Sequence, residues 1–424
     1  MLKTLWIEGG EPLEGEFQVS TAKNAVLPVV VSTLLSKEPV TLLDVPRLRD
    51  IEVLLDLLAT LGTRFAWEGS TLHLHTPEIV SIDAAYELVS QLRASFIVLG
   101  ALLARVGEAR MPMPGGCAFG PRPVDLHIKA LRALGAEISE DAGAFQARRA
   151  KPFTGRVVFD IPTVGGTEQV ILAAALGEGE VVVVNAAQEP EIVDLAQFLN
   201  GLGAQIQGAG TSMLIVKGVK SLAGGSYRVI PDRIEAGTFL LAAAATRGDL
   251  LLRNVNIYHL DALLAKLRES GHRLETGPDW IRLSATSEPI PLVIEAREYP
   301  GFPTDLQPPV TAYLATVPGV SLVSDRVYPE RTTHVGELAR MSADLTLKDR
   351  VIAVNGTTLR GATVRAFDLR AAGALLIAAL AATGQTRLEN AHHLERGYAN
   401  LEARLKALGV NVASSIGLSD LAAD

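Results

Sequence analysis

The sequence predicts an α/β protein with two domains, built from six similar units that surround buried helices. Three observations lead to this prediction. The chain has 424 residues, which is too long for one ordinary hydrophobic core. A pattern of a β-like run, a polar link, a helical run and a small-residue stop recurs with a period of roughly 70 residues. Some helical runs have no polar face, as in Phe239-Leu-Leu-Ala-Ala-Ala-Ala, and such helices are buried.

Short β-like runs mark the repeated units. They begin at Glu38, Gly107, Gly179, Gly248, Gly319 and Gly384. From Gly107 onward, the starting glycines are 72, 69, 71 and 65 positions apart. In several units another β-rich run precedes the apolar helix, and the later helix is amphipathic, as in Ile51–Leu61. Each unit is therefore expected to read strand–helix–strand–helix–strand–strand, with the amphipathic helix outside.

Composition narrows the classes of function. A net charge of −8 argues against a general nucleic-acid binder, because neutralising phosphates requires a basic face. The single cysteine, Cys117, cannot form a disulfide within the chain. The N-terminus does not resemble a signal peptide, and the most apolar stretch, Ala371–Ala382, is shorter than the ~20 residues that cross a bilayer. We therefore expect a cytoplasmic protein with no membrane span and no nucleic-acid partner.

Polar side chains stand where the β-rich runs meet the apolar helices. They are Lys23 and Asn24, Arg93, Thr163, Asp232 with Arg233 and Glu235, Asp305, and Asp368 with Arg370. The N-terminus of a helix presents free N–H groups and the positive end of the helix dipole, which favour anions. Any one of these side chains could instead cap its helix, as we expect for Asp232. The set predicts an anion site, because repetition would bring equivalent junctions together.

Two irregular segments contain candidate catalytic groups. In Met113–Pro123, Gly and Pro surround Cys117 and exclude regular helix or strand. A lone cysteine is usually a small buried hydrophobe, but the loop and the nearby Arg122 favour a reactive thiolate. In Pro300–Gln307, prolines lead into Asp305, which could cap a helix or act as a base. The spacing of cysteines and histidines fits none of the usual metal sites, so no metal is expected.

Several motifs, taken together, resemble the UDP-N-acetylglucosamine 1-carboxyvinyltransferases, a family of enolpyruvyl transferases. They are Ala22-Lys-Asn-Ala25, Leu92-Arg-Ala-Ser95, Pro114-Gly-Gly-Cys117, Arg122-Pro-Val-Asp-Leu-His127, Glu189-Pro-Glu-Ile-Val-Asp194, Pro231-Asp-Arg-Ile-Glu-Ala-Gly-Thr238, Phe302-Pro-Thr-Asp305, Asp368-Leu-Arg370 and Arg396-Gly-Tyr398. The resemblance implies a two-domain inside-out α/β barrel with three βαβαββ repeats in each domain. We expect residues 1–21 plus 231–424 to form one domain and residues 22–230 to form the other.

The resemblance also implies an activity. The enolpyruvyl group of phosphoenolpyruvate passes to the 3′-hydroxyl of UDP-N-acetylglucosamine, and phosphate is released. This reaction is the first committed step of peptidoglycan synthesis, and it needs no cofactor. The expected partners are therefore these two small molecules.

Residue roles are likewise implied by the resemblance. The catalytic positions are Cys117 as general acid, Asp305 as the base at the 3′-hydroxyl, Lys23 and Arg396. Lys23, Arg93, Arg122, Arg370 and Arg396 are expected around phosphoenolpyruvate. The remaining substrate-binding positions are Asn24, Pro123, Val124, Asp125, Leu126, Thr163, Val164, Gly165 and Val327, with Arg331 and Asp368 in support.

Four positions depart from the common family pattern, namely Thr21, Arg49, Ile161 and Gln188. None of them is an expected catalytic position. One alternative is the sister enzyme that acts on shikimate 3-phosphate, which the Pro-Gly-Gly-Cys loop and the segment Glu189–Asp194 disfavour. The other is a non-catalytic sugar-nucleotide-binding paralogue, which is disfavoured because the catalytic residues are retained.

Overall fold

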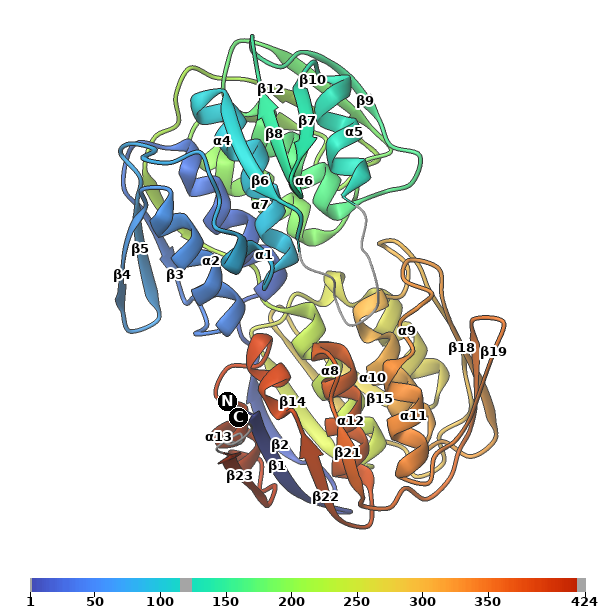
Figure 1. The fold of residues 1–424 in the computed structure, drawn as a ribbon. Coiled ribbons are helices and arrows are strands. Elements are labelled where there is room, and N and C mark those ends of the chain that lie inside the picture. The colour runs from blue at the N-terminus through green and yellow to red at the C-terminus, as the bar shows by residue number, and fades with distance from the viewer. Residues whose placement is uncertain (1, 115–123, 418–424) are drawn as a thin grey trace. The chain divides into compact units, whose positions relative to one another are not determined.

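The computed structural model describes residues 2–114 and 124–417. The chain divides into two compact units, which Figure 1 draws as ribbons. Unit 1 combines Met1–Ser20 with Pro231–Asp424, and unit 2 is Thr21–Ile230. Unit 1 is therefore built from both ends of the chain, whereas unit 2 is continuous.

Unit 1 contains three four-stranded sheets. The first has the order β2–β14–β16–β15, with bounds Gly15–Gln18, Asp249–Arg253, Trp280–Ser284 and Arg273–Thr276. The second has the order β17–β18–β20–β19, with bounds Val293–Ala296, Val320–Asp325, Val351–Asn355 and Asp344–Lys348. The third has the order β21–β22–β1–β23, with bounds Thr363–Arg365, Gly384–Glu389, Leu2–Gly9 and Val412–Gly417. In each sheet the first two strands are parallel and the remaining pairs are antiparallel.

Unit 2 contains two four-stranded sheets and, within its described residues, one three-stranded sheet. The first has the order β13–β3–β5–β4, with bounds Gly225–Arg228, Val40–Leu43, Thr71–His75 and Arg64–Glu68. The second has the order β6–β8–β7, with bounds Glu108–Pro112, Ala144–Arg148 and Glu137–Asp141. The third has the order β9–β10–β12–β11, with bounds Gly155–Val158, Glu180–Val184, Met213–Lys217 and Gln205–Gln207.

Apolar helices form the interior of each unit. In unit 1 the helices α8 (Arg233–Ala245), α10 (Gln307–Leu314) and α12 (Leu369–Ala381) pack against one another, as Figure 1 shows. Their Ala and Leu side chains are almost all buried, which confirms that a helix without a polar face lies inside. In unit 2 the corresponding helices are α1 (Lys23–Ser32), α4 (Val98–Val106) and α6 (Val164–Ala174).

The remaining helices are shorter or amphipathic. They are α2 (Arg49–Thr60), α3 (Tyr86–Val89), α5 (Asp125–Ala133), α7 (Pro190–Gly201), α9 (Asp261–Glu269), α11 (Thr333–Arg340) and α13 (Leu401–Ala407). The 3-10 segments are η1 (Thr33–Leu35), η2 (Arg93–Ile97), η3 (Ile257–His259), η4 (Thr304–Leu306) and η5 (Ala391–Arg396). In α2 the leucines are buried whereas Glu52 and Asp56 face solvent, as expected for an outer helix.

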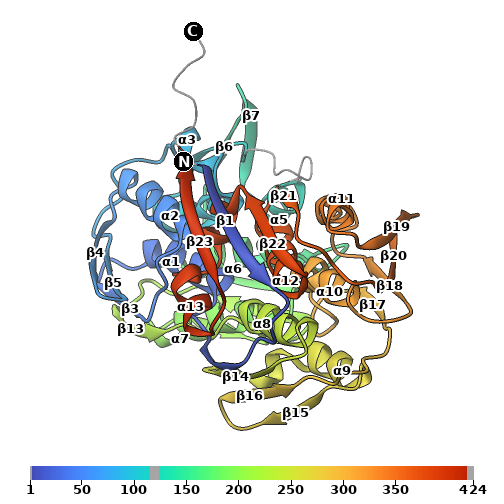
Figure 2. The ribbon, with the colours of Figure 1, turned by 90° about the horizontal axis from the view of Figure 1, so that it is seen from below.

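Strand pairing differs from the expected order in four places. Strand β2 leads into α1 but pairs with β14, and β13 leads into α8 but pairs with β3. Each of these strands therefore belongs to one unit, whereas the helix that follows it belongs to the other. Strand β1 lies between β22 and β23, as the blue arrow between the red ones shows in Figure 2. In the three-stranded sheet, Asp83 makes only an isolated bridge to Arg110 where the other sheets have a parallel strand.

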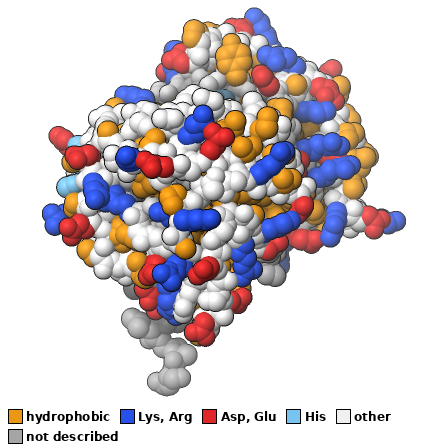
Figure 3. Space-filling model, turned by 90° about the horizontal axis from the view of Figure 1, so that it is seen from above, with side chains coloured by type: hydrophobic (Ala, Val, Ile, Leu, Met, Phe, Trp, Pro, Cys, Tyr) orange, Lys and Arg blue, Asp and Glu red, His pale blue; other side chains and the backbone are white. Residues whose placement is uncertain are grey.

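The mixed α/β class is confirmed, and every β-like run that marked a predicted unit forms a strand. Among the residues that the structure describes, no helix combines the length and apolar character needed to cross a membrane. On the face drawn in Figure 3, acidic and basic side chains are interspersed with hydrophobic ones. Charge on that face is therefore mixed in sign.

The packing of α12 predicts a large effect of truncating its core side chains. Leu375 is fully buried, so Leu375→Ala is expected to lower the free energy of unfolding by about 2–5 kcal/mol. Urea unfolding followed by tryptophan fluorescence measures this change. Leu347→Ala is the matched control, because Leu347 is exposed, and it is expected to change stability by less than about 0.5 kcal/mol. Equal effects of the two variants would contradict the buried position of α12.

Candidate functional site

Asp305 lies between two arginines in unit 1. Arg331 Nη1 donates to Asp305 Oδ1 at 2.7 Å and to the carbonyl of Thr304 at 3.0 Å. Arg370 Nη2 donates to Asp305 Oδ2 at 2.5 Å. The side chains of Arg331, Arg370 and Asp305 are only 7%, 12% and 20% exposed. We call these three residues the Asp305 clamp.

The arginines control the ionisation of Asp305. Burial alone would raise the pKa of its carboxyl group, but the charges of Arg370 and Arg331 outweigh this effect. They hold the pKa of Asp305 well below its usual range, so the carboxylate is ionised at neutral pH. Asp305 lies inside η4, whose N-cap position is Pro303, and the N-cap position of α10 is Leu306. Asp305 thus occupies neither cap position, and its role as a base stays a prediction.

A ring of contacts joins the helices that carry the clamp. Asp368 caps α12, because its Oδ1 accepts from the N–H groups of Arg370 at 2.8 Å and Ala371 at 3.0 Å. Its Oδ2 accepts from the hydroxyl of Thr333, the first residue of α11, at 2.8 Å. Arg331 precedes α11, and Arg370 lies in the first turn of α12. The Thr333–Asp368 contact joins these two helix starts and therefore fixes the distance between the two arginines.

A second aspartate shapes the loop before Arg331. Asp325 Oδ2 accepts from the Thr304 hydroxyl at 2.6 Å, next to Asp305. Its Oδ1 accepts from the N–H groups of Val327 at 2.9 Å and Tyr328 at 2.7 Å. Asp325 therefore holds the backbone of Val327, which is a predicted substrate-binding residue, whereas the side chain of Val327 is exposed. Sequence analysis missed Asp325, although an aspartate that ends a strand before a turn is a usable signal.

Other junction residues surround Arg370. Asp232 caps α8 as predicted, with its Oδ1 accepting from Ile234 N at 2.8 Å and Glu235 N at 3.0 Å. Asp305, Tyr398 and Asp232 act on Arg370 by charge and, against the effect of burial, raise its pKa further. The starts of α8, α10 and α12 thus meet at one place. Arg396 lies at the end of η5, which packs against α12.

In unit 2, Lys23 begins α1 and its Nζ lies 2.8 Å from Asp50 Oδ2. Asp50 is a buried residue of α2, so this ion pair joins the two helices. Asn24 follows in the same first turn. Arg93 begins η2, which packs against both α1 and α6. The predicted residues Lys23 and Arg93 therefore stand on elements in direct contact.

The starts of α5 and α6 also lie close together. A Cβ placed on Gly165 would be 2.8 Å from His127 Cε1, so only glycine fits beside this ring. The His127 ring meets Phe96 edge to face, with centroids 5.4 Å apart. Burial and then the charge of Arg93 lower the pKa of His127 to about 4. Thr163 caps α6 through Gly166 N at 3.2 Å.

These contacts place several predicted positions in one region of unit 2. The positions are Arg93, Val124, Asp125, Leu126, Thr163, Val164 and Gly165, at the starts of η2, α5 and α6. Cys117, Arg122 and Pro123 lie outside the described residues. Groups of three or more His, Cys, Asp or Glu suited to holding a metal ion do not occur in residues 2–114 and 124–417.

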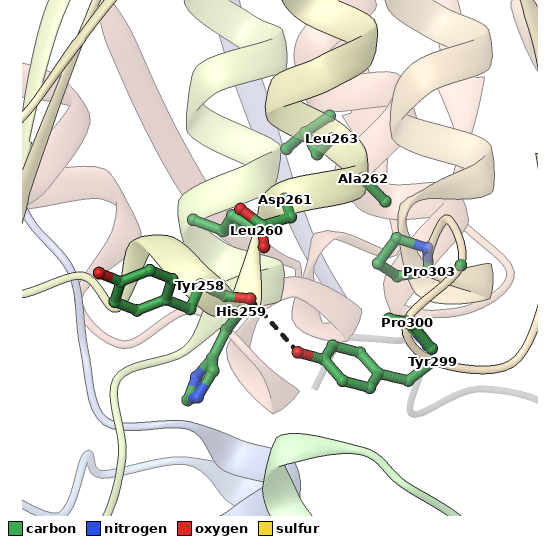
Figure 4. A pocket seen from close by; sticks show the side chains of 10 residues that line it. Tyr258, His259, Leu260, Asp261, Ala262, Leu263, Tyr299, Pro300 and Pro303 are labelled. Atoms are coloured by element: carbon green, nitrogen blue, oxygen red, sulfur yellow. Dashed lines mark hydrogen bonds between the residues drawn. The ribbon is translucent and has the colours of Figure 1, made fainter. Parts of the chain in front are cut away.

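A small pocket of about 30 Å³ lies beside the segment that leads to Asp305 (Figure 4). It is lined by Tyr258–Leu263, Tyr299–Gly301 and Pro303, and no predicted site residue is among them. The hydroxyl of Tyr299 donates to the carbonyl of Tyr258 at 3.3 Å, as the dashed line in Figure 4 marks. The segment before Asp305 is thus fastened to η3.

The arrangement is suited to anions. Two arginines around one carboxylate leave a net charge of +1 within the Asp305 clamp itself. The first N–H groups of α8 and α12 are already taken by the caps Asp232 and Asp368, so the arginines are the cationic groups of the clamp. Arginine presents a planar fork of donors that fits carboxylates and phosphates. An ionised carboxylate beside such cations can accept a hydrogen bond from a hydroxyl group of a ligand.

Comparisons with known proteins agree with this chemistry. A family model described as EPSP synthase (3-phosphoshikimate 1-carboxyvinyltransferase) matches residues 7–405. The chain is 63% identical over 422 residues to a UDP-N-acetylglucosamine 1-carboxyvinyltransferase of Thermus thermophilus, covering 100% of this chain and 99% of the relative. It is 54% identical over 410 residues to a protein of the same name from Deinococcus deserti, covering 96% of each.

Solved structures show the same fold. The enolpyruvyl transferase NikO from Streptomyces tendae matches with a TM-score of 0.89 and 24% identity, covering 98% of this chain and 99% of that chain. EPSP synthase from Acinetobacter baumannii matches with a TM-score of 0.76 and 15% identity, covering 98% and 100%.

The clamp predicts a pH-dependent contribution of Asp305 to stability. Because its pKa is lowered on folding, the contribution is fully present above the unfolded pKa of about 4 and is lost as pH falls through the folded pKa. At pH 7, Asp305→Asn is expected to lower the free energy of unfolding by about 3 kcal/mol, because two buried arginines lose their partner. Urea unfolding at several pH values measures the difference, which is expected to shrink below pH ~4.

The control is Glu330→Gln, which removes an exposed ion pair with Arg350. It is expected to change stability by less than about 1 kcal/mol at any pH. A loss for Asp305→Asn that is as small as this, or that does not vary with pH, would contradict the role of the clamp.

Proposed function

The chain belongs to the UDP-N-acetylglucosamine 1-carboxyvinyltransferase family of enolpyruvyl transferases, and from this premise we propose how its residues carry out the reaction. The reaction moves the enolpyruvyl group of phosphoenolpyruvate to the 3′-hydroxyl of UDP-N-acetylglucosamine and releases phosphate, the first committed step of peptidoglycan synthesis. The observation that carries this conclusion is the 63% identity to a protein of that name over the full chain.

We propose that phosphoenolpyruvate is bound by Lys23, Arg93, Arg122, Arg370 and Arg396. The substrate has a carboxylate and a phosphate close together, and several fixed cations are needed to hold both. What supports this is the net positive charge of the Asp305 clamp and the position of Lys23 and Arg93 at helix starts.

The sugar nucleotide is proposed to contact two further groups of residues. The first is Asn24 with Pro123, Val124, Asp125 and Leu126. The second is Thr163, Val164, Gly165 and Val327. The support is local: Val124, Asp125 and Leu126 stand at the start of α5 and Thr163, Val164 and Gly165 at the start of α6, and the close packing of His127 against Gly165 holds these two helix starts together.

In the proposed addition step, the 3′-oxygen forms a bond to C2 of phosphoenolpyruvate. The Cys117 thiol gives its proton to C3, which becomes a methyl group, and the Asp305 carboxylate takes the proton of the hydroxyl. In the elimination step, the bond from C2 to the phosphate oxygen breaks, the Cys117 thiolate takes one methyl proton, and the proton held by Asp305 leaves with the phosphate. The product is the enol ether, and the acid and base return to their starting states.

The clamp sets the timing of proton transfer in this proposal. A carboxylate with a strongly lowered pKa is a weak base toward an intact hydroxyl. The hydroxyl becomes acidic only as its oxygen bonds to C2. We therefore propose that Asp305 first orients the hydroxyl by accepting its hydrogen bond, and accepts the proton late.

We also propose the finer architecture that the resemblance implies. The sheets would be copies of one βαβαββ module, three in each unit around buried helices, in an inside-out α/β barrel. The domains would be the two units, with Asp305, Arg370 and Arg396 in unit 1 and the Cys117 loop in unit 2. The support is that five sheets of the described residues each have one parallel pair followed by two antiparallel pairs. The cytoplasmic location stays a prediction.

Phosphate release from phosphoenolpyruvate tests the function directly. We expect release with UDP-N-acetylglucosamine as acceptor and none above background with shikimate 3-phosphate. Release with only shikimate 3-phosphate would instead identify the sister activity. No release with either acceptor would identify a non-catalytic paralogue.

Cys117 provides a separate test of the catalytic assignment. We expect Cys117→Ser to lower kcat severely, because a serine hydroxyl is a much weaker acid than a thiol. Epoxide phosphonates of the fosfomycin type are expected to alkylate the wild-type protein in the presence of UDP-N-acetylglucosamine, as intact-mass spectrometry measures. Cys117→Ser is the matched control, since Cys117 is the only cysteine. Undiminished turnover of the variant, or an adduct on it, would contradict the assignment.

A further inference from the structure

His334 is a fully buried side chain in the first turn of α11, with 0% exposure. Neither of its ring nitrogens has a hydrogen-bond partner. The other buried histidines differ: His127 contacts Gln169, and His272 contacts Tyr313 at 2.7 Å and accepts from Thr286 N. Buried polar atoms almost always have partners, because each unpaired one costs free energy. His334 therefore needs an explanation that simple core packing does not supply.

A third unpaired polar atom lies on the neighbouring arginine. Arg331 Nε is buried and has no partner, whereas its Nη1 is fully used by Asp305 and the carbonyl of Thr304. Arg331 stands three positions before His334, at the entry to α11. Burial and then the charge of Arg331 lower the pKa of His334 to about 3, so the imidazole is neutral. It therefore offers one N–H donor and one acceptor nitrogen.

Two of the three atoms are complementary through one small polar molecule. The Nε–H of Arg331 is a donor that needs an acceptor, and the imidazole has an acceptor nitrogen that needs a donor. A single water between them would accept from the first and donate to the second. Such a bridge fixes the Nε edge of the guanidinium plane. Since the guanidinium is rigid, fixing one edge also fixes the edge that faces Asp305.

We propose that His334 is a positioning residue for the reaction, which holds Arg331 through one internal water and thereby aims the guanidinium at Asp305. It contacts no substrate in this role. The proposal rests on the proposed function, because it assigns to His334 an effect on the base of that reaction. Its effect is expected on proton transfer and not on substrate binding.

The test compares an apolar with a polar replacement. His334→Leu fills the site with a residue of similar size but cannot bind the water. If His334 were only a core residue, removing its unpaired nitrogens would leave catalysis unchanged and would not reduce stability. We expect His334→Leu to lower kcat about tenfold, the effect of losing one hydrogen bond to a charged group. KM for each substrate is expected to stay within about twofold.

Two further variants make the result specific. His334→Gln keeps a donor and an acceptor and is expected to regain most of kcat. Leu338→Met is the matched control on the same helix, because Leu338 is equally buried, and it is expected to leave kcat unchanged. If His334→Leu does not fold, His334→Phe takes the place of His334→Leu in the comparison, because phenylalanine has a ring but no polar nitrogen.

A double-mutant cycle with Arg331→Lys separates positioning from an independent effect. Lysine has no Nε–H edge, so His334→Leu is expected to have no further effect on kcat in that background. Wild-type kcat in His334→Leu, or effects that multiply, would overturn the proposal. If the wild-type protein releases no phosphate, the proposed function fails. The double-mutant cycle is then measured by urea unfolding. Changes in the free energy of unfolding that are coupled between the two sites support the water bridge, and additive changes refute it.

Discussion

The carboxylate of Asp305 is the constraint on which the arrangement of unit 1 depends. An ion removed from water is tolerated only when opposite charges and hydrogen bonds surround it. Here Arg331 and Arg370 supply both, and they come from the starts of two different helices. Satisfying one carboxylate therefore brings η4, α11 and α12 to a common point. The Asp368 cap and the Thr333 hydroxyl close the ring, so no member can shift without breaking a contact elsewhere.

Local features of this arrangement could be predicted from the sequence. Asp232 caps its helix because its side chain reaches N–H groups two and three positions ahead, which depends only on neighbouring residues. The starts of α1 at Lys23 and of η2 at Arg93 follow from the same local signals. Burial of the apolar helices follows from composition alone. These local signals therefore agree with the observed helix starts at Lys23, Arg93 and Arg233.

Partners distant in the chain could not be predicted in this way. Nothing near Asp305 indicates that its charge is balanced by Arg370, 65 positions later, so capping and catalysis stayed open. The pairing of β2 with β14 and of β13 with β3 does not follow from the repeat pattern, because strand pairing depends on contacts that such a pattern does not encode. Only the domain bounds implied by the family resemblance placed these strands in those domains. His334 escaped notice because a buried histidine next to an arginine has no signal of its own in the sequence.

The clamp imposes two opposing demands on Asp305. Strong pairing orients the carboxylate and keeps it ionised, which a hydroxyl-binding group requires. The same pairing makes it a poor proton acceptor, because every step that lowers its pKa lowers its basicity equally. In the proposed mechanism, the two demands are compatible only if proton transfer follows bond formation, when the attacking oxygen has become a strong acid. The geometry of the arginines, and not the pKa of the isolated carboxyl group, then limits how well Asp305 performs.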